Sequence, residues 1–192
     1  MKREQIIEAA RSLFHKFGFK KVSMDEIALE ANVTKKTIYM YFSSKEELLK
    51  YFIDEEINNM KNIIEDEEKK GLDFFETVNN TIYKLLKYRK ERDFISLISR
   101  EAELLKNEVI VKNLKLIDDE IQEYIKNKLI VAKENGYIYY EDLDVCAFLI
   151  YKMYIALILE WNDKNLDEKM IANSISKILK FGLRKDVDKN EE

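Results

Sequence analysis

The chain contains almost nothing that ends a helix. Its 192 residues include no proline and only four glycines. These two residues form most of the tight turns between strands, so a β protein of this length would need many more of them. Charged residues make up 36% of the chain beside 46% hydrophobic residues. The composition therefore predicts an all-α protein.

Apolar residues recur at helical spacing along most of the chain. Stop and start signals separate these segments, for example Asn135-Gly136 after one long helix. After the first 43 residues we expect helices at 44–67, 72–90, 94–105 and 108–134. A further helix is expected from Asp142 or Asp144 to Trp161, and a last one from Asp167 to Leu183. With the helices before them, the total is about nine.

Residues 23–50 predict two short helices joined by a tight turn and followed by a third helix. Ser23 and Glu26 have the spacing of a capping box at the start of the first helix. Asn32 tolerates the left-handed conformation of a sharp corner, and Thr34 is a good N-cap for the second helix. This is the pattern of a helix-turn-helix, which places its second helix in the major groove of DNA.

The second helix of the pair has an outer face without an acidic residue. Ile38 and Phe42 lie four residues apart and are expected to face the core. The side chains left outside suit contacts with phosphates and base edges: Lys35, Lys36, Thr37, Tyr39 and Tyr41. For the two tyrosines, the alternative is a half-buried ring that only packs.

The start of the third helix combines a predicted capping box with a lysine. Ser44 and Glu47 have the spacing of a second capping box, and Lys45 lies in the first helical turn. A cation there opposes the helix dipole unless an anion balances it. Lys45 and the adjacent backbone amides therefore form an expected phosphate site, with an ordinary solvated lysine as the alternative.

The net charge of −4 hides an uneven distribution. Residues 1–50 carry 10 Lys and Arg against 7 Asp and Glu, whereas residues 51–192 carry 23 against 30. The balance is thus +3 in the first segment and −7 in the second. Positive charge is local to the helix-turn-helix pattern, and the acidic remainder is expected to stay away from phosphates. We expect a DNA-binding domain at 1–50 and a second helical domain at 51–192.

Residues 6–49 resemble the N-terminal DNA-binding domain of the TetR family of transcriptional regulators. The segments that carry the resemblance are Phe17-Gly18-Phe19, Ser23, Ile27-Ala28, Ala31-Asn32-Val33-Thr34, Thr37-Ile38-Tyr39-Met40-Tyr41-Phe42 and Lys45-Glu46-Glu47-Leu48. The family usually has glycine where Asn32 stands, and often where Lys36 stands. The resemblance implies phosphate contacts by Thr34, Tyr41 and Lys45, contacts near base edges by Lys35, Thr37 and Tyr39, and either role for Lys36.

The resemblance also implies a repressor that a small effector releases from its operator. Residues compatible with an effector pocket among the middle helices are Tyr83, Phe94, Glu103, Tyr124, Tyr154 and Trp161. Because small-molecule pockets are mostly apolar, a lipophilic effector is expected, although the same aromatic residues also suit an ordinary helical core. Glu103 would meet a cationic effector if it points inward. The alternative is a constitutive or partner-controlled DNA-binding factor without such a pocket.

The last two long helices have more apolar surface than one face can bury inside a domain of this size. Such an antiparallel pair docks on its copy in a second subunit as a four-helix bundle, so we expect a homodimer. Two recognition helices related by two-fold symmetry would read a palindromic operator, with half-sites about 34 Å or somewhat more apart. A monomer with both helices in its core is the alternative.

Little in the sequence suggests catalysis, metal binding or membrane insertion. His15 is the single histidine, and no Gly-rich phosphate loop or metal-ligand spacing occurs, so neither enzyme activity nor a cofactor is expected. The single cysteine, Cys146, is expected in the core. Without a recognisable secretory signal or a membrane-length apolar stretch, we expect a cytoplasmic protein.

A further alternative is a helical interaction scaffold that does not bind nucleic acid. This alternative would leave the clustered lysines unexplained.

Overall fold

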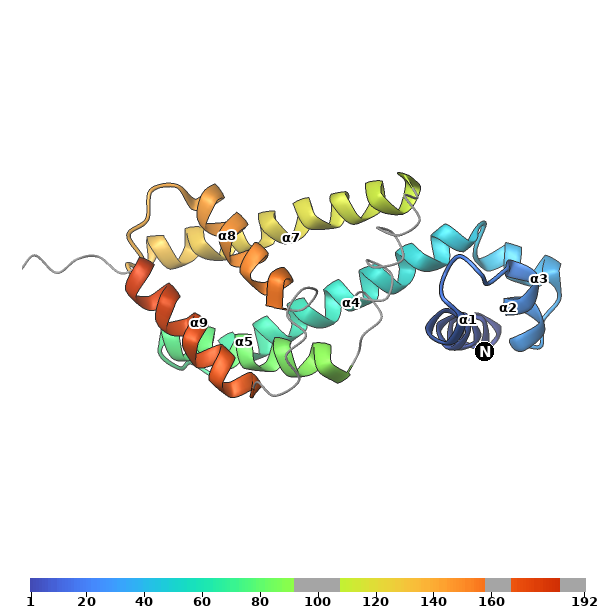
Figure 1. Cartoon of the computed structure of the whole chain (residues 1–192), viewed down its shortest axis with the longest axis horizontal. Helices are drawn as coiled ribbons and strands as arrows, with labels where there is room; N and C mark the ends of the chain where they lie inside the picture. Colours follow the sequence, from blue (N-terminus) through green and yellow to red (C-terminus); the bar gives the residue numbers. More distant parts are fainter. Residues whose placement is uncertain (92–107, 158–166, 184–192) are drawn as a thin grey trace, which may run out of the picture. The chain divides into compact units, whose positions relative to one another are not determined.

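The computed structural model describes residues 1–91, 108–157 and 167–183 (Figure 1). Within these ranges it contains no strand, which confirms the expected all-α fold. The helices described are α1 (Lys2–Phe17), α2 (Met24–Glu30), α3 (Lys35–Tyr41), α4 (Lys45–Glu68), α5 (Phe74–Glu91), α7 (Glu108–Glu134), α8 (Leu143–Ile155) and α9 (Glu168–Leu183). None of them combines the length and apolarity that crossing a lipid bilayer requires.

Two compact units make up the chain. Of the described residues, the first comprises 1–59 and 108–116, and the second comprises 60–91, 117–157 and 167–183. Helix α4 therefore contributes its beginning to the first unit and its end to the second. A domain boundary after residue 50 stays a prediction, and that position lies within α4.

The first unit packs α1, α2, α3 and the start of α4 around a closed apolar core. Side chains without exposed surface come from all of these helices: Ile6, Ala10, Phe14, Ile27, Ile38, Leu48 and Phe52. The ring of Phe14 lies at the centre, 5.2 Å from the ring of Phe19 and 6.1 Å from that of Phe52. Because each helix buries residues in one core, α2 and α3 are held as a fixed pair on α1 and α4.

A charged contact joins α1 to α4 beside this core. The Arg11 guanidinium forms ion pairs with the carboxylates of Glu55 and Glu56, and it lies 4.6 Å from the centre of the Phe52 ring. The Glu56 side chain is almost fully buried, and such a carboxylate needs a cation nearby. Arg11 thus ties the first helix to the helix that continues into the second unit.

Observed helix boundaries follow the expected ones closely. The helices expected at 44–67 and 72–90 correspond to α4 and α5, shifted by at most two residues, and the helix expected at 108–134 coincides with α7. The helix expected at 94–105 lies outside the described residues, as does the end of the one expected to reach Trp161. Local signals therefore predicted these boundaries well.

An N-cap residue accounts for the start of α8, and glycines follow the ends of α4 and α7. The Asp142 carboxylate accepts a hydrogen bond from the Val145 amide at 3.0 Å, so Asp142 rather than Asp144 is the N-cap. Gly71 and Gly136 have φ values of 66° and 75°, which side chains with a Cβ rarely adopt. Both glycines stand where a helix has just ended.

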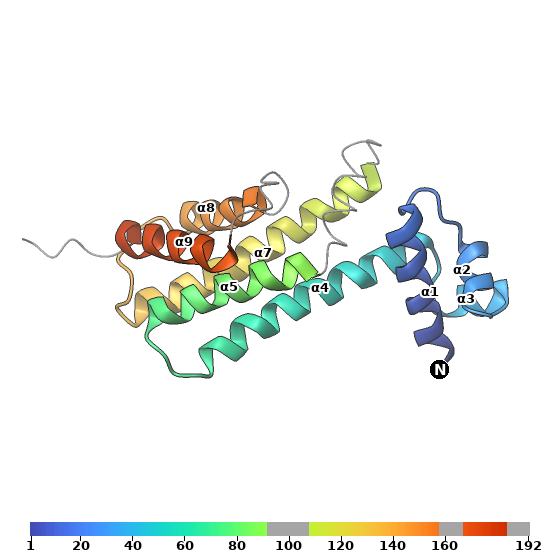
Figure 2. The same cartoon turned by 60° about the horizontal axis from the view of Figure 1, so that its bottom comes forward.

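The second unit has its own core. Its buried members are Leu129, Ala132, Ile138, Cys146 and Ala147, and Phe74 and Phe75 pack against them. Helices α5 and α9 lie side by side in both views (Figure 1; Figure 2). Cys146 is in the core as expected, and burial raises the pKa of its thiol, which keeps it protonated and inert.

Glu67, at the end of α4, is a fully buried carboxylate in the second unit. Its oxygens lie 2.8 Å from the Lys70 ammonium and 2.5 Å from that of Lys84 on α5. Hydrogen bonds from these two lysines, Lys70 first, hold the pKa of Glu67 below its usual value. The contact therefore ties the end of α4 to α5 only while the carboxylate is ionised.

We predict that Glu67→Gln lowers the free energy of unfolding by about 1–2 kcal/mol at pH 7, because two charged hydrogen bonds are weakened. The pKa of Glu67 is lower in the folded state than in the unfolded state. The extra stability of the wild-type protein over the variant is therefore complete above pH 4.5, and it is lost as the pH falls through the folded-state pKa of Glu67. Urea denaturation at pH 7 and at pH 3 measures the difference. An equal difference at both pH values would contradict this role of the carboxylate.

Candidate nucleic-acid interface

The capping box at the start of α2 is present. The Ser23 hydroxyl accepts a hydrogen bond from the Glu26 amide at 3.2 Å, and the Glu26 carboxylate accepts one from the Ser23 amide at 2.7 Å. Hydrogen bonds from Ser23 hold the pKa of Glu26 below its usual value. The box fixes where α2 begins and so positions the helix that precedes the corner.

The corner between α2 and α3 also has the expected geometry. Asn32 has a φ of 51°, the only positive value of a non-glycine residue in the described chain. The Val33 amide donates to the Ala28 carbonyl at 2.9 Å, which closes the corner. Thr34 then caps α3, because its hydroxyl accepts from the Thr37 amide at 3.2 Å. These contacts confirm Asn32 as the corner residue and Thr34 as the N-cap.

Burial fixes how α3 is rotated about its axis. Ile38 has no exposed surface and Phe42 is 3% exposed, so this side of the helix faces the core as predicted. On the other side, Tyr39 and Tyr41 are 46% and 43% exposed. Thr34, Lys35 and Lys36 are exposed as well, and Thr37 is half-buried. The side chains expected outside are therefore accessible, and their DNA contacts stay a prediction.

The outer face is less purely basic than the sequence of α3 suggests. Helix α3 contains no acidic residue, but Asp25 on α2 forms an ion pair of 2.8 Å with Lys35. A hydrogen bond to Asp25 raises the pKa of Lys35. Lys35 would have to leave or share this carboxylate to reach a base edge, whereas Lys36 has no ion pair among the described residues.

Lys45 has a structural role that its position in the sequence did not reveal. Its ammonium donates to the carbonyls of Phe19 at 2.8 Å, Lys20 at 3.3 Å and Val22 at 2.7 Å. It also lies 4.5 Å from the centre of the Phe19 ring. The alternative of an ordinary solvated lysine is thus wrong. The phosphate contact remains a prediction, and it concerns a group that already holds the α1–α2 loop.

The expected capping box at the start of α4 is only half correct. Ser44 accepts from the Glu47 amide at 3.2 Å, as predicted. The Glu47 carboxylate, however, accepts from the amide and hydroxyl of Ser43, at 2.6 and 2.7 Å, instead of from Ser44. Bonds from Ser43 hold the pKa of Glu47 below its usual value. The α3–α4 connection is therefore fixed one residue earlier than expected.

Arg3 is a cation near α3 that the sequence analysis missed. Its guanidinium lies 5.4 Å from the centre of the Phe42 ring and 4.8 Å from that of the Tyr51 ring. It therefore places positive charge at the end of α3 opposite Thr34. No short-range pattern could reveal this, because the contact joins residues about 40 positions apart in the chain.

Only half of the residues predicted for an effector pocket are described. Tyr83, Tyr124 and Tyr154 are partly buried in the second unit, whereas Phe94, Glu103 and Trp161 lie outside the described residues. The Tyr124 hydroxyl is buried without a hydrogen-bond partner among the described residues, and burial raises its pKa. The Tyr154 hydroxyl donates to the Met60 sulfur at 3.5 Å. Both Tyr124 and Tyr154 lie in the unit where a pocket was expected.

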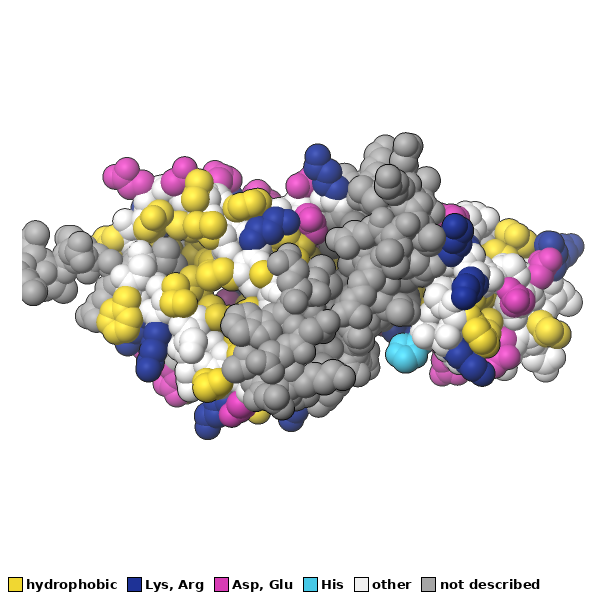
Figure 3. All heavy atoms as spheres, in the orientation of Figure 1, with side chains coloured by type: hydrophobic (Ala, Val, Ile, Leu, Met, Phe, Trp, Pro, Cys, Tyr) yellow, Lys and Arg dark blue, Asp and Glu magenta, His cyan; other side chains and the backbone are white. Residues whose placement is uncertain are grey.

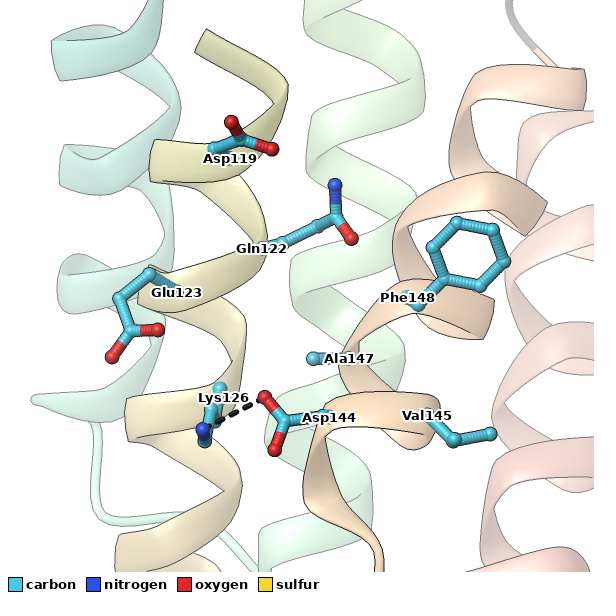
Figure 4. A pocket seen from close by; sticks show the side chains of 8 residues that line it. All are labelled: Asp119, Gln122, Glu123, Lys126, Asp144, Val145, Ala147 and Phe148. Carbon is cyan, nitrogen blue, oxygen red and sulfur yellow. Dashed lines mark ion pairs between the residues drawn. The ribbon is translucent and has the colours of Figure 1, made fainter. Parts of the chain in front are cut away.

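A pocket that the sequence did not predict lies between α7 and α8 (Figure 4). It has a volume of about 490 Å³ and is lined by Asp119, Gln122, Glu123, Lys126, Asp144, Val145, Ala147 and Phe148. An ion pair of 2.7 Å joins Lys126 to Asp144 across it. Half of the lining residues are charged, and none of the predicted effector residues contributes to the pocket. No cluster of potential metal ligands occurs in the described part of the chain.

The fold and the α2–α3 corner define a helix-turn-helix DNA-binding protein, and comparison with known proteins specifies the family. Residues 6–52 match the family described as "Bacterial regulatory proteins, tetR family". The HTH-type transcriptional regulator YhgD of Bacillus subtilis (strain 168) is 31% identical over 184 residues, covering 95% of this chain and 96% of that protein. The chain therefore belongs to the TetR family and is a DNA-binding transcriptional regulator.

Solved structures share this fold over most of the chain. A TetR-family protein from Syntrophomonas wolfei superposes with a TM-score of 0.79 at 22% identity, covering 97% of this chain and 98% of that one. The fatty acid degradation regulator FadR from Bacillus halodurans superposes with a TM-score of 0.74 at 21% identity, covering 95% and 96%. At these identities the likeness concerns the fold alone.

We predict that Lys45→Ala lowers the thermal stability of the protein without DNA, because three carbonyls lose their charged donor. The expected loss is about 1.5–3 kcal/mol, the range for hydrogen bonds to a charged group. Lys50→Ala, at an exposed lysine of the same helix, is the matched control and should leave the melting temperature nearly unchanged. If Lys45→Ala melts like wild type and only DNA binding weakens, Lys45 acts as a phosphate ligand rather than as a loop anchor.

Proposed function

We propose that this regulator is a homodimeric repressor that binds a palindromic operator through α3 and is released by a small lipophilic effector. It would act in the cytoplasm, where operator DNA is accessible. The observation that carries the proposal is the exposed, acid-free face that α3 presents opposite the buried Ile38. Lys36 lies in the middle of that face, where a phosphate or a base edge of the major groove would meet it.

The proposed contacts divide by their chemistry. Thr34 and Tyr41 lie at the two ends of α3, where the strands that border the groove would pass, and their hydroxyls suit phosphates. Lys35, Thr37 and Tyr39 would contact the base edges. Lys35 would break its ion pair with Asp25 to do so. Lys45 would donate to a phosphate by giving up one of its three carbonyl contacts in the α1–α2 loop, the 3.3 Å contact with Lys20 being the longest.

Exposed apolar side chains on α8 and α9 support the homodimer. Figure 3 shows apolar side chains gathered over these helices on one face of the second unit. The exposed members are Val145, Phe148 and Leu149 on α8 and Met170, Ile178 and Phe181 on α9. Phe181 is 73% exposed and Ile178 is 61% exposed, which is costly unless a partner covers them. A second copy supplies the same apolar surface and gives the two-fold symmetry that a palindromic operator requires.

Two buried hydroxyls in the second unit support the effector. The Thr81 hydroxyl has no hydrogen-bond partner among the described residues, and the Tyr124 hydroxyl is buried beside the Lys128 ammonium. A buried polar group without a partner is unfavourable, and a ligand with a polar head and an apolar body would relieve this. Because FadR from Bacillus halodurans is described as a fatty acid degradation regulator, we propose a fatty acid as the class of effector.

The charged lining of the α7–α8 pocket favours a second candidate function. That pocket is open to solvent, and its four charged side chains, Asp119, Glu123, Lys126 and Asp144, could pair with charged groups of a protein partner. In this alternative the protein binds DNA constitutively, or under the control of a protein partner, and no small effector exists.

We predict that DNA selected by the protein from a random-sequence pool is an inverted repeat, with half-sites about one helical turn or somewhat more apart. Lys36→Ala should weaken binding to the selected duplex. If Lys36 contacts a phosphate, the variant should also lower the slope of log Kd against log salt by about one. Glu141→Ala, at an exposed loop position of the second unit, is the control. A selected site without two-fold symmetry would contradict the homodimer.

We predict that palmitate displaces the protein from the selected duplex in a fluorescence anisotropy titration. Tyr124→Phe should raise the palmitate concentration needed about tenfold, because the carboxylate loses one hydrogen bond from a buried donor. Octyl glucoside at the same concentrations controls for a detergent effect. Undiminished DNA binding at saturating palmitate would contradict a fatty acid effector and favour the second candidate function.

A further inference from the structure

Met40 is the most exposed apolar side chain of α3. It is 74% exposed, compared with 46% for Tyr39 and 43% for Tyr41 on either side of it. Met40 does not belong to the buried core of the first unit, so its exposed side chain does not stabilise the fold. A single exposed apolar residue is common on protein surfaces, but Met40 stands between two partly exposed tyrosines on the helix proposed to contact DNA, where a duplex would cover it.

The rotation of α3 places Met40 at the centre of the DNA-facing side. Successive helical residues are about 100° apart, so residue 40 lies about 200° around the axis from the buried Ile38. Lys36 lies on the same outer line, one helical turn earlier. A duplex seated on α3 through Lys36 would therefore cover Met40 and remove its thioether from water.

We propose that Met40 determines operator sequence by packing against the 5-methyl group of a thymine in the major groove. This inference rests on the proposed DNA contact of α3. Guanine, adenine and cytosine present hydrogen-bonding groups in the major groove, and a thioether cannot satisfy them well. Thymine presents a methyl group there, and it is the only apolar group among the base edges. The flexible methionine side chain can follow that methyl group without strain.

Deoxyuridine isolates this contact, because it pairs like thymine and keeps the O4 acceptor but lacks the methyl group. The probe is the duplex selected from the random pool, with each thymine of the half-site replaced singly by deoxyuridine. At the thymine that Met40 contacts, the replacement should weaken wild-type binding about fourfold in each half-site, the ratio expected for one methyl group.

The variants identify the residue responsible. Met40→Ala should bind the thymine and deoxyuridine duplexes equally, whereas Met40→Leu should keep the preference for thymine. Leu29→Ala is the matched control, because Leu29 is an 82% exposed apolar residue of the same unit that lies on α2. It should also keep the preference. Thermal melting of each variant without DNA shows whether it is folded.

Two outcomes would overturn the inference. One is a half-site in which no deoxyuridine replacement affects wild-type binding, or which contains no thymine. The other is a thymine preference that survives in Met40→Ala. Both leave the proposed function intact, because the protein would still select a duplex and still lose affinity in Lys36→Ala. A protein that selects no duplex would instead contradict the proposed function itself.

Discussion

The burial of Ile38 determines which way every other side chain of α3 points. This residue has no exposed surface, and the helix is too short to turn about its axis without removing it from the core. Asn32 and Thr34 set where α3 begins, so both its start and its rotation are fixed before DNA binds. Lys36 and Met40 are directed outward as a result, and the backbone of α3 needs no rearrangement when a duplex covers them.

Helix α4 is held by charged contacts in each of the two units. In the first unit Arg11 ties it to α1, and in the second the buried Glu67 ties its end to α5. Further along the second unit, Lys61 pairs with Glu120 of α7 at 2.7 Å. We infer that a helix anchored in both units is the element through which effector binding would change the pose of α3, as an allosteric account requires.

The sequence predicted contacts that close within four residues and missed those that join distant segments. The Ser23 capping box and the Thr34 N-cap depend on backbone spacing, which a sequence displays directly. Lys45 contacts carbonyls more than twenty residues earlier in the chain, and Lys35 contacts Asp25. Both contacts depend on the conformations that these long side chains adopt once the helices have packed. Residues for an effector pocket could be named only by type, because a pocket arises from helices packed together and has no local signal. The rotation of α3 was predictable, because Ile38 was expected to face the core, but the exposed fraction of Met40 came from the structure.

The most direct test of the account measures whether DNA covers the outer face of α3. Lys36→Cys in a Cys146→Ala background provides one reactive thiol on that face, and Glu141→Cys in the same background provides one in the exposed α7–α8 loop. The rate of alkylation is measured with and without the selected duplex. The account predicts that the duplex strongly slows alkylation at position 36 and leaves position 141 unchanged. Equal rates at position 36 with and without bound duplex would contradict it.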